Sequence, residues 1–320
     1  MIVSSFNIRG LGGALKRRRI KELIRNHRID FLAIQETKLE VITDSLCFNL
    51  WGSHDCNWAY LPSEGRSGGI LSIWSKSNNL LIFSFMGDGF VGVCLEWGLL
   101  KTICFVVNVY SKCDLASKRT LWNNILNCKR GLGDGRWCVV GDFNAVCSPE
   151  ERVGVNGDEG RMLSTEMVEF RDFLEKLELV DLPLLGRRFS CFHSSGRAMS
   201  RIDRILISDE WASRWGNVEL WVLLRDISDH CPLLLKYNFE DWGPKPFRFN
   251  NFWLDNRKFK GVVESLWRNF NVNGWMGFVL QEKLKLLKSS LRLWHKQEYG
   301  GMEANIEELM VEIKDIDVRG

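Results

Sequence analysis

The 320-residue sequence lacks several features that would place it in a special class of protein. It has no apolar run long enough to span a membrane, no internal repeat and no low-complexity tract. Its formal net charge is only +3, which is too small to indicate a nucleic-acid-binding protein by charge alone. Because 45% of the residues are hydrophobic, we expect a globular protein with a sizeable core rather than a disordered or fibrous chain.

The ten cysteines form no C-x-x-C pair, and several lie inside apolar runs, as Cys94, Cys104 and Cys138 do. This pattern argues against zinc-binding motifs and is typical of reduced thiols in the core of an intracellular protein. Met1 leads directly into a strand-like segment, which leaves no room for a cleaved signal peptide. We therefore expect a soluble, intracellular protein that does not bind membranes, in a location compatible with the nucleus.

The most informative segment is Gly141-Asp142-Phe143-Asn144, which follows a short apolar run with the β-branched content of a buried strand. Side chains alternate faces along an extended chain, so Asp142 and Asn144 are expected to project to the same side. A carboxylate that orients or deprotonates water, next to an amide that donates to phosphoryl oxygens, suits phosphodiester hydrolysis. An Asx turn that only satisfies backbone groups explains the tetrapeptide equally well.

Polar side chains also stand at the ends of three other strand-like apolar runs. Ligands in open α/β sheets bind beyond the carboxyl ends of the strands, so four such strand ends predict one convergent pocket. The further polar residues are Asn7 at the end of the first run, Gln35 and Glu36 after the second, and Tyr110 after the third.

The region beyond residue 200 supplies a carboxylate and an imidazole. Residues 201–207 alternate polar and apolar side chains as a half-buried strand does, which places Asp203 on the polar side with Arg201. Ser228-Asp229-His230 precedes another apolar run, and a nearby carboxylate would support the cationic form of His230, which could hold a phosphate. Taken singly, such an aspartate is more often an ion-pair partner of a neighbouring arginine, and a lone histidine is more often structural.

In this order, the segments resemble the motifs of the endonuclease/exonuclease/phosphatase family. More narrowly, residues 7–12, 228–233 and 246–253 resemble the apurinic-type endonuclease domain of plant non-LTR (LINE-type) retrotransposons, truncated before the reverse transcriptase. The resemblance implies an α/β fold, a four-layer α/β sandwich of two mixed β-sheets flanked by helices, with a helical C-terminal extension. The six family motifs fall at residues 5–10, 35–38, 108–110, 141–144, 200–204 and 228–230.

The resemblance also implies a metal site. Glu36 would be the principal carboxylate for Mg²⁺, with Asn7 beside the metal and Asp229 near it, and Mn²⁺ is the alternative ion. A hard Mg²⁺ ion prefers a few oxygen ligands and keeps several waters, which fits a site that offers carboxylates and amides.

By the same resemblance, the catalytic groups divide the work of hydrolysis. Asp142 would position or deprotonate the attacking water, while Asn144 and Tyr110 would stabilise the phosphoryl group. His230, oriented by Asp203, would contact the scissile phosphate. The candidate substrate-binding residues are Arg9, Ser190, Arg201, Ser228, Arg187 and Arg188.

Three departures from the family pattern bear on the substrate. DNA-repair members carry an acidic residue where this chain has Arg9, which weakens the repair-enzyme interpretation and favours the retroelement one. The proline that commonly follows the catalytic tyrosine is replaced by Ser111, and the aromatic residue expected after Ser190 is Cys191. We expect the loops at these positions to hold DNA less well.

The densest basic cluster lies in residues 16–19, on a segment whose apolar residues fall at helical spacing. A plain, solvated helix surface explains it better than a dedicated phosphate-binding face or a nuclear-import signal. Arg187 and Arg188 precede a strand-like segment and are better candidates for touching DNA. Their alternative is a solvated turn.

Along the chain, the sequence predicts helices near residues 15–28, 114–128 and 164–177, a loop at 154–160, and a turn at Gly68-Gly69 that opens a strand. The composition changes near residues 241–246, so we expect an endonuclease domain at 1–240 and a helical linker region at 241–320. Helices at 277–297 and 302–315 would pack on the core, on each other, or on an absent polymerase domain.

These features favour a Mg²⁺-dependent endonuclease that nicks DNA and leaves a 3′-hydroxyl. One alternative keeps the fold and changes the substrate to a phosphoinositide or sphingomyelin, since a shared fold does not decide function. The other is a catalytically idle retroelement remnant that acts only by binding. Turnover of a soluble phosphoinositide headgroup, or DNA binding without Mg²⁺-dependent cleavage, would discriminate between them.

Overall fold

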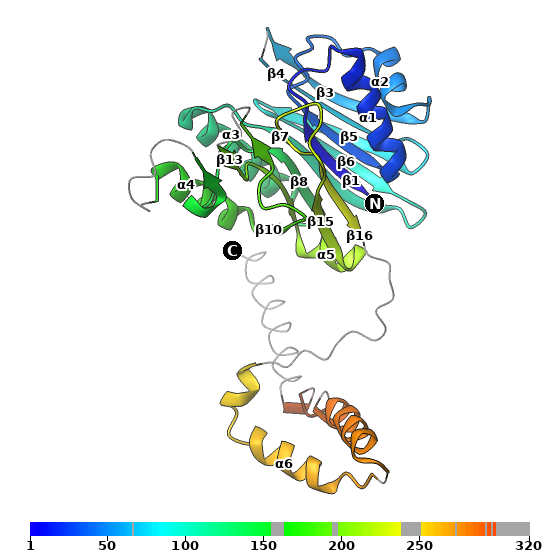
Figure 1. Cartoon of the computed structure of the whole chain (residues 1–320), viewed down its shortest axis with the longest axis vertical. Coiled ribbons are helices and arrows are strands. Elements are labelled where there is room, and N and C mark those ends of the chain that lie inside the picture. Colours follow the sequence, from blue (N-terminus) through cyan, green and yellow to red (C-terminus); the bar gives the residue numbers. More distant parts are fainter. Residues whose placement is uncertain are drawn as a thin grey trace, which may run out of the picture. The chain divides into compact units, whose positions relative to one another are not determined.

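The computed structural model describes residues 1–65, 67–154, 163–193, 198–237, 251–272, 274–291, 293–295 and 297–298 (Figure 1). The chain divides into two compact units, Met1–Phe239 and Glu240–Gly320. Nearly all of the loop expected at 154–160, the composition change at 241–246 and the helix expected at 302–315 lie outside the described residues. Within the described part, no helix combines the length and apolar character needed to cross a membrane.

The first unit is built on two mixed β-sheets, each of which contains one central parallel pair (Figure 1). The seven-stranded sheet runs in the order β11 (Leu184–Leu185), β15 (Val218–Val222), β16 (Leu233–Tyr237), β1 (Val3–Asn7), β2 (Phe31–Gln35), β4 (Ser67–Ser75) and β3 (Cys56–Glu64).

The six-stranded sheet runs in the order β10 (Val180–Asp181), β14 (Asp203–Ile207), β8 (Trp137–Asp142), β7 (Thr102–Tyr110), β6 (Phe90–Trp97) and β5 (Asn79–Gly87). A small third sheet joins β12 (Cys191–Phe192), β13 (Met199–Ser200) and β9 (Arg152–Val153), which follows the 3₁₀ turn η1 (Pro149–Glu151).

In the first unit, three hydrophobic clusters lie between four layers, two of helices and two of sheet. One cluster lies between the sheets and includes Phe31 and Trp74, whose rings stack at 5.9 Å. The second packs α1 (Ala14–His27) and α2 (Asp44–Trp51) on the seven-stranded sheet, and the third packs α3 (Leu115–Leu132) and α4 (Thr165–Leu177) on the six-stranded sheet. Each fully buried large apolar side chain contributes about 1.5–3 kcal/mol. The order of helices, sheet, sheet and helices confirms the predicted α/β sandwich.

The helix limits follow local capping. Asp114 and Ser164 accept hydrogen bonds from backbone N–H groups in the first turns of α3 and α4, which sets where both helices begin. α3 continues to Leu132, four residues beyond the expected end, and stops where Gly133 adopts a positive φ of 84°. The short helix α5 (Asp209–Trp215) follows β14.

The prediction of a half-buried strand at 201–207 is wrong. The strand β14 begins at Asp203, and all five of its residues are buried. Its side chains face the core between the sheets on one side and the helix-covered core on the other, where Arg204 packs over the ring of Phe170 at 5.2 Å. Charged side chains in a strand can be fully buried when they are paired, so polar alternation did not indicate solvent exposure here.

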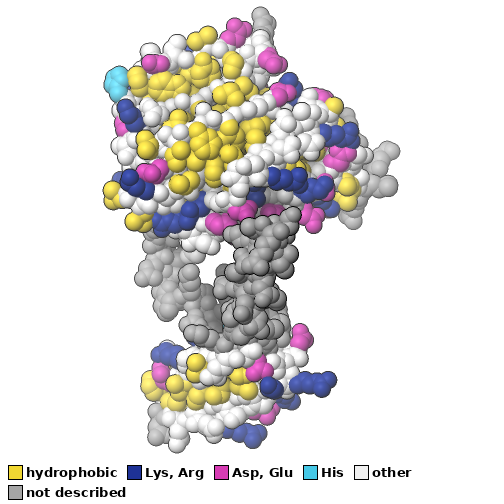
Figure 2. Space-filling view, turned by 180° about the vertical axis from the view of Figure 1, so that it is seen from behind, with side chains coloured by type: hydrophobic (Ala, Val, Ile, Leu, Met, Phe, Trp, Pro, Cys, Tyr) yellow, Lys and Arg dark blue, Asp and Glu magenta, His cyan; other side chains and the backbone are white. Residues whose placement is uncertain are grey.

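The surface carries charges of both signs. Figure 2 shows Lys and Arg side chains interspersed with Asp and Glu, next to a broad group of exposed hydrophobic side chains. The edge strand β5 contributes exposed Leu80, Ile82 and Met86. This face has no dominant sign of charge, and with a formal net charge of only +3 nucleic-acid recognition depends on local groups.

In the second unit, η2 (Asn251–Asp255), α6 (Phe259–Asn269) and helical residues 276–291 share a small core. Trp253, Phe259 and Leu291 are its buried members, and Leu287 packs against them. On the helix expected at 277–297, Leu280 and Leu284 lie one turn apart, and both are exposed. The described helices of this unit therefore pack on each other through Leu287 and Leu291 and leave Leu280 and Leu284 uncovered.

Candidate active site

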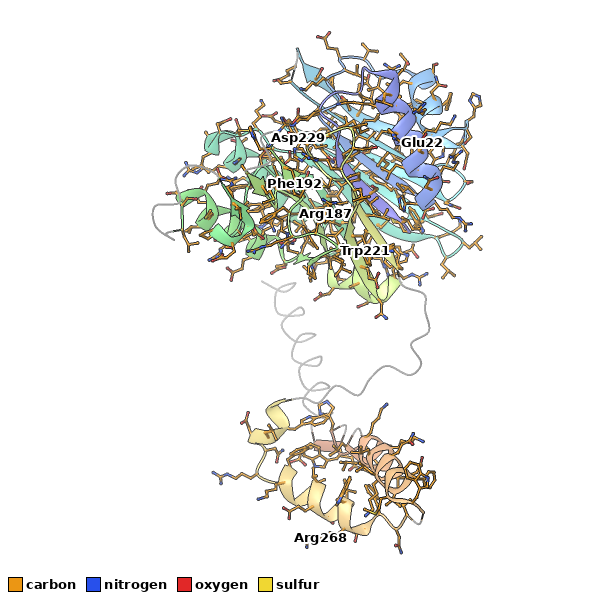
Figure 3. All side chains as sticks on the ribbon, in the orientation of Figure 1. Glu22, Arg187, Phe192, Trp221, Asp229 and Arg268 are labelled. Carbon is orange, nitrogen blue, oxygen red and sulfur yellow. The ribbon has the colours of Figure 1, made fainter. Side chains whose placement is uncertain are left out.

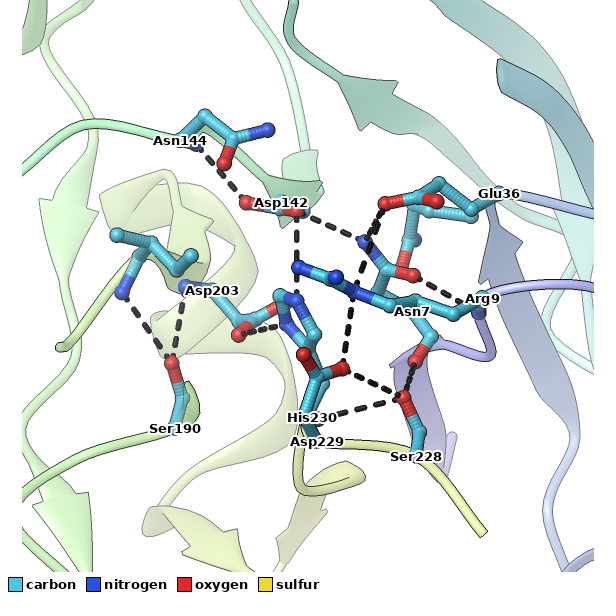
Figure 4. A network of polar contacts seen from close by, with 12 residues as sticks. Asn7, Arg9, Glu36, Asp142, Asn144, Ser190, Asp203, Ser228, Asp229 and His230 are labelled. Atoms are coloured by element: carbon cyan, nitrogen blue, oxygen red, sulfur yellow. Dashed lines mark hydrogen bonds and ion pairs between the residues drawn. The ribbon is translucent and has the colours of Figure 1, made fainter. Parts of the chain in front are cut away.

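The ends of four central strands meet at one edge of the sandwich. Parallel pairing of β1 with β2 sets Asn7 opposite Gln35, and parallel pairing of β7 with β8 sets Tyr110 opposite Asp142. The Asn7 amide Nδ2 then donates a hydrogen bond of 2.9 Å to Asp142 Oδ2, which links the two sheets (Figure 4). The polar strand ends therefore converge because both parallel pairs end at the same edge.

Two glycines allow the backbones to approach closely at this edge. Gly141 has φ 142°, and a Cβ atom there would lie 2.0 Å from the carbonyl oxygen of Val109 on the neighbouring strand. Gly69 has φ 84°, and a Cβ atom there would lie 2.3 Å from Thr37 Oγ1. The carbonyl groups of Gly68 and Gly69 accept hydrogen bonds of 3.0 Å from the backbone N–H groups of Lys38 and Thr37. The pair lies near the start of β4, as expected for a strand opening, but it does not form the expected turn, and it holds the segment that carries Glu36.

Glu36 occupies a strained backbone position next to Asn7. Its φ is 51°, and Arg9, Lys38 and Asn144 around it also have positive φ values. Non-glycine residues in this conformation cluster at functional sites, where the surrounding structure holds them. Glu36 is only 9% exposed, and its Oε1 accepts a hydrogen bond of 3.0 Å from Asn7 Nδ2.

A cationic side chain already lies between two carboxylates of the site. Arg9 Nε is 2.9 Å from Asp229 Oδ1 and 3.9 Å from Glu36 Oε1, and Lys38 Nζ is 3.5 Å from Glu36 Oε2. The groups that face the guanidinium of Arg9 are carboxylate oxygens, which are the ligands that a hard divalent cation prefers. The arrangement therefore fits a site for such an ion. Asn7 presents its Nδ2 to the carboxylates, while its Oδ1 accepts the Arg9 N–H at 3.1 Å.

Asp142, Asp203 and His230 form a buried cluster. β8 and β14 pair in a register that sets Asp142 opposite Asp203, and His230 Nδ1 donates to Asp203 Oδ2 at 2.8 Å. Burial, reinforced by the charge of Asp203, raises the pKa of Asp142 to about 7. Burial alone would lower the pKa of His230, but the charge and hydrogen bond of Asp203 outweigh it and raise that pKa well above its ordinary value.

The other nitrogen of His230 faces Asp142. Nε2 lies 3.9 Å from Asp142 Oδ2 and, among the described residues, has no hydrogen-bond partner. His230 is completely buried, and an unsatisfied buried donor costs about 1–3 kcal/mol. Such an atom is suited to meet a group that the protein itself does not supply, and a phosphate oxygen would satisfy it.

Asn144 and Tyr110 lie at the rim of this cluster. The backbone N–H of Asn144 donates to Asp142 Oδ1 at 2.9 Å, which is the Asx-turn contact, so the turn and the site are the same structure. Because its φ is 48°, Asn144 does not continue the strand, contrary to the expected alternation. Its Nδ2 donates to Ser111 O at 2.7 Å. Burial, followed by the charges of Glu36 and Asp142, raises the pKa of Tyr110, so the phenol keeps its proton.

Two serines predicted to bind substrate occupy supporting positions. Ser190 is fully buried, and its Oγ accepts hydrogen bonds of 3.2 and 3.0 Å from the backbone N–H groups of Ile202 and Asp203. Ser228 Oγ donates to the carbonyl of Asn7 at 2.8 Å (Figure 4). Both hydroxyl groups therefore fix the backbone from which catalytic candidates project.

The arginines of the region separate into two groups. Arg201 and the buried Arg204 both pair with Glu151 and Asp181 and not with Asp203, so the ion-pair alternative for Asp203 is wrong. Arg187 and Arg188 are exposed. Their guanidinium groups lie 5.9 Å from the ring centre of Phe192 and 5.4 Å from that of Phe189. Figure 3 shows where Arg187 and Phe192 lie on the fold relative to Asp229.

Two lysines and an arginine donate hydrogen bonds to the backbone of the site, a role that the sequence did not indicate. Lys16 Nζ donates to the carbonyl groups of Ile8 and Arg9 at 2.5 and 3.0 Å, and Arg17 Nε donates to Leu11 O at 3.0 Å. Part of the basic cluster on α1 therefore holds the loop after β1 rather than facing solvent. Lys118, which is 2% exposed, donates to the carbonyl of Asn144 at 2.7 Å. A lysine within a helical pattern carries no signal of this kind.

The profile of the endonuclease/exonuclease/phosphatase family matches residues 4–230 of the chain. A search of curated proteins finds no match.

Solved structures give the same picture of the fold. A 3′-phosphatase from Neisseria, NExo, bound to a product DNA hairpin, has a TM-score of 0.59 at 17% identity, covering 75% of this chain and 100% of its own. An AP endonuclease from Archaeoglobus fulgidus has a TM-score of 0.56 at 17% identity, with coverage of 74% and 99%. The endonuclease domain of TRAS1, a telomere-specific non-LTR retrotransposon, has a TM-score of 0.54 at 14% identity, with coverage of 75% and 99%. At such identities the similarity shows the fold alone.

Proposed function

Because the chain belongs to the endonuclease/exonuclease/phosphatase family, we propose that it hydrolyses phosphodiester bonds in DNA with the help of Mg²⁺. The coarser part of this statement, a hydrolase acting on phosphate esters, follows from family membership. The ion, the substrate and the residue roles are proposals supported by the geometry of the site.

The carboxylates of Glu36 and Asp229 would hold the metal, with Asn7 beside it. Arg9 lies between these carboxylates and would have to move aside, which its half-exposed position allows. When bound, the ion would supply positive charge to the phosphate oxygens, and Mn²⁺ would serve as the alternative ion.

The protein side chains would divide the remaining work. Asp142 would orient the attacking water and take its proton, for which a pKa of about 7 is well matched. His230, held cationic by Asp203, would donate from Nε2 to the scissile phosphate. Tyr110 would donate its phenolic proton to a phosphoryl oxygen, and Asn144 would stabilise the same group.

The observation that best supports this assignment is the unpartnered Nε2 of His230. A buried cationic imidazole with one nitrogen committed to a carboxylate, and the other 3.9 Å from a second carboxylate, needs an anionic ligand. A phosphodiester supplies oxygens at that position, and the water-activating carboxylate stands beside it.

We further propose that the product is a nick with a 3′-hydroxyl, as in a retrotransposon endonuclease. The likeness to the TRAS1 domain and the presence of Arg9 instead of an acidic residue support this proposal. The unit Glu240–Gly320 would then be a linker region toward a polymerase domain. The hydroxyl groups of Ser228 and Ser190 would fix the backbone that carries Asn7 and Asp203. Arg187, Arg188 and Arg201 remain predicted DNA contacts. A nuclear location has no support from the comparisons and stays a prediction.

Relaxation of supercoiled plasmid tests the function. We expect the full chain to nick plasmid with Mg²⁺, and Asp142→Asn and His230→Asn to lower the rate by at least about 100-fold, as loss of a catalytic acid or base does. Extension of the nick by a DNA polymerase without prior phosphatase treatment would show the 3′-hydroxyl. His27→Asn, on the half-exposed end of α1, is the matched control and should nick normally.

Three results would redirect the proposal. Undiminished nicking by both site variants would remove the assigned residues from the reaction. Turnover of a soluble phosphoinositide headgroup that exceeds plasmid nicking would favour the alternative substrate. DNA binding without Mg²⁺-dependent cleavage would favour a protein that acts only by binding.

A further inference from the structure

Cys191 lies across from His230 on a neighbouring strand. The two residues form an isolated antiparallel bridge, and backbone hydrogen bonds of 2.7 and 2.8 Å flank the bridge on both sides. This pattern makes Cys191 and His230 a non-hydrogen-bonded pair, in which the side chains share one face and approach each other closely. The sequence pattern of the cysteines gave no sign of this proximity.

Asp229 completes a compact set of ligand atoms. A sulfur of Cys191, a ring nitrogen of His230 and a carboxylate oxygen of Asp229 all lie within 4.8 Å of one another. Four ligand atoms around a tetrahedral zinc ion lie about 3.3–3.8 Å apart, so shifts of about 1 Å would close this set around an ion. Cys191 and Asp229 are half-buried, so an ion can reach them from solvent.

His230 is prepared for metal ligation by its other nitrogen. Metal-binding histidines almost always donate their second ring N–H to a carboxylate, and His230 Nδ1 donates to Asp203 Oδ2 at 2.8 Å. The remaining nitrogen, Nε2, is the buried atom that has no hydrogen-bond partner in the described part of the chain. While His230 is cationic this atom carries a proton, and loss of that proton would leave a lone pair free to bind a metal ion.

We propose that Cys191, Asp229 and His230 form a binding site for Zn²⁺, which shares Asp229 and His230 with the hydrolytic centre. A thiolate, an imidazole and a carboxylate together select Zn²⁺ over Mg²⁺, which binds oxygen ligands. A water molecule or a phosphate oxygen would take the fourth position, and Asp142 Oδ2, 3.9 Å from Nε2, offers a further oxygen nearby.

The charges around the site favour a divalent ion. Three carboxylates, those of Asp142, Asp203 and Asp229, surround His230. Zinc binding would release to solvent the proton of Nε2 and that of the Cys191 thiol, so zinc competes with protons for both atoms, and its bonds to all three groups would offset that cost. Arg9, the present partner of Asp229, is half-exposed and can turn toward solvent.

A second cluster with similar spacing serves as a comparison. Cys147, Glu151 and Asp181 also place ligand atoms within 4.8 Å of one another. The two carboxylates, however, pair with Arg201 and with Arg204, which is completely buried. An ion there would have to displace fixed positive charge, so we expect no site, and Cys147 provides a matched control.

Occupation by zinc would inhibit hydrolysis. The ion would withdraw Nε2 of His230 from the substrate phosphate and take an oxygen of Asp229 from the Mg²⁺ position. This consequence rests on the proposed function, whereas zinc binding itself does not.

Titration of the full chain with Co²⁺ tests the site without any enzymatic assay. Cobalt substitutes for zinc, and a cobalt–thiolate bond gives a charge-transfer absorption band in the near ultraviolet. We expect one equivalent of Co²⁺ to produce the band, and Zn²⁺ to abolish it by displacement. Cys191→Ser should remove the band and weaken Zn²⁺ binding by more than about 100-fold, since loss of an outer partner alone typically costs 10–100-fold.

Two controls give the titration its specificity. Cys147→Ser and Cys113→Ser, the latter an exposed thiol, should keep the band. A band that survives Cys191→Ser, or no band in the wild-type chain, would overturn the site. Asp229→Asn offers a second variant that leaves the thiol in place, and it should weaken Zn²⁺ binding measured by competition with a chromophoric chelator.

Inhibition of plasmid nicking by Zn²⁺ tests the consequence for activity separately from metal binding. In plasmid nicking with saturating Mg²⁺, Zn²⁺ should inhibit the Cys147→Ser protein as strongly as the wild type, and should inhibit Cys191→Ser only at concentrations more than about 100-fold higher. If plasmid nicking is absent in every protein, the cobalt titration still decides the site. Failure of the proposed function and failure of the metal site are thus distinguishable.

Discussion

Replacing Asp203 with asparagine removes the charge beside His230 and keeps an oxygen that can accept the Nδ1 hydrogen bond. The carboxylate is 2% exposed and lies 2.8 Å from the imidazole, so solvent screens this interaction little. A hydrogen bond to a charged group contributes about 1.5–3 kcal/mol. If the imidazolium makes its phosphate contact mainly in the transition state, kcat/KM should fall by roughly 10- to 150-fold.

The pH profile should move as well, in a direction fixed by the charges. Asp142 acts as a base only when deprotonated, so activity falls as the pH drops through its pKa of about 7. Asp203→Asn removes a charge that raises this pKa, so the acid limb should move to lower pH. The same substitution removes the main cause that raises the pKa of His230. The imidazolium should therefore lose its proton at a lower pH, and the alkaline limb of the profile should also move to lower pH.

The measurement is initial plasmid nicking at saturating Mg²⁺ across a pH series, with the melting temperature of each variant recorded to exclude unfolding. Asp172→Asn, which neutralises an exposed carboxylate on α4, is the matched control. A rate for Asp203→Asn within about threefold of wild type, or two limbs that stay in place, would refute the assigned coupling.

Two further predictions concern the ion pairs around the site. Arg9→Gln should let half-maximal nicking occur at a lower Mg²⁺ concentration, because Arg9 no longer competes for Asp229 and Glu36, and the shift should stay within about tenfold because the pair is partly exposed. An unchanged Mg²⁺ titration would contradict the cation position inferred from Arg9. Glu151→Gln should destabilise the fold by about 3 kcal/mol at neutral pH, since buried Arg204 loses a partner. Burial would raise the pKa of Glu151, but the hydrogen bond and charge of Arg204 outweigh it and lower that pKa. The stabilisation that Glu151 contributes is therefore present above the pKa of this group in the unfolded chain, and it is lost as the pH falls through the pKa in the folded protein. Denaturant unfolding should therefore show the two proteins converging at acid pH, while Glu169→Gln, in an exposed pair, should match wild type throughout.

The fold was largely predictable because its determinants are local. Apolar runs, their polar ends and the capping residues of α3 and α4 are visible in the chain, and helix limits agreed within a few residues except at Leu132. Burial of β14 was missed because its coverage by α4, Glu151 and Asp181 depends on segments far away in sequence. Alternation of polar and apolar residues reports exposure only when nothing covers the polar face.

The support of the site was harder to predict than its members. Lys16 and Lys118 hold backbone carbonyl groups of Arg9 and Asn144, and no residue type announces such a role. Ser190 was singled out as a substrate contact, yet its hydroxyl binds backbone N–H groups. Motif membership indicated that this serine matters, but only geometry shows what it touches.

By itself, the sequence determined which chemical groups are present, and that Asn7, Glu36, Tyr110 and Asp142 stand at strand ends, because periodicity and strand limits are local properties. The tertiary structure alone decided which of these groups face each other. The register of β8 with β14 sets Asp142 opposite Asp203, and the bridge between Cys191 and His230 brings a thiol to the imidazole. Charges and distances between residues that far apart in the chain exist only once the sheets pair, and the pKa of Asp142, the orientation of His230 and the zinc site all depend on them.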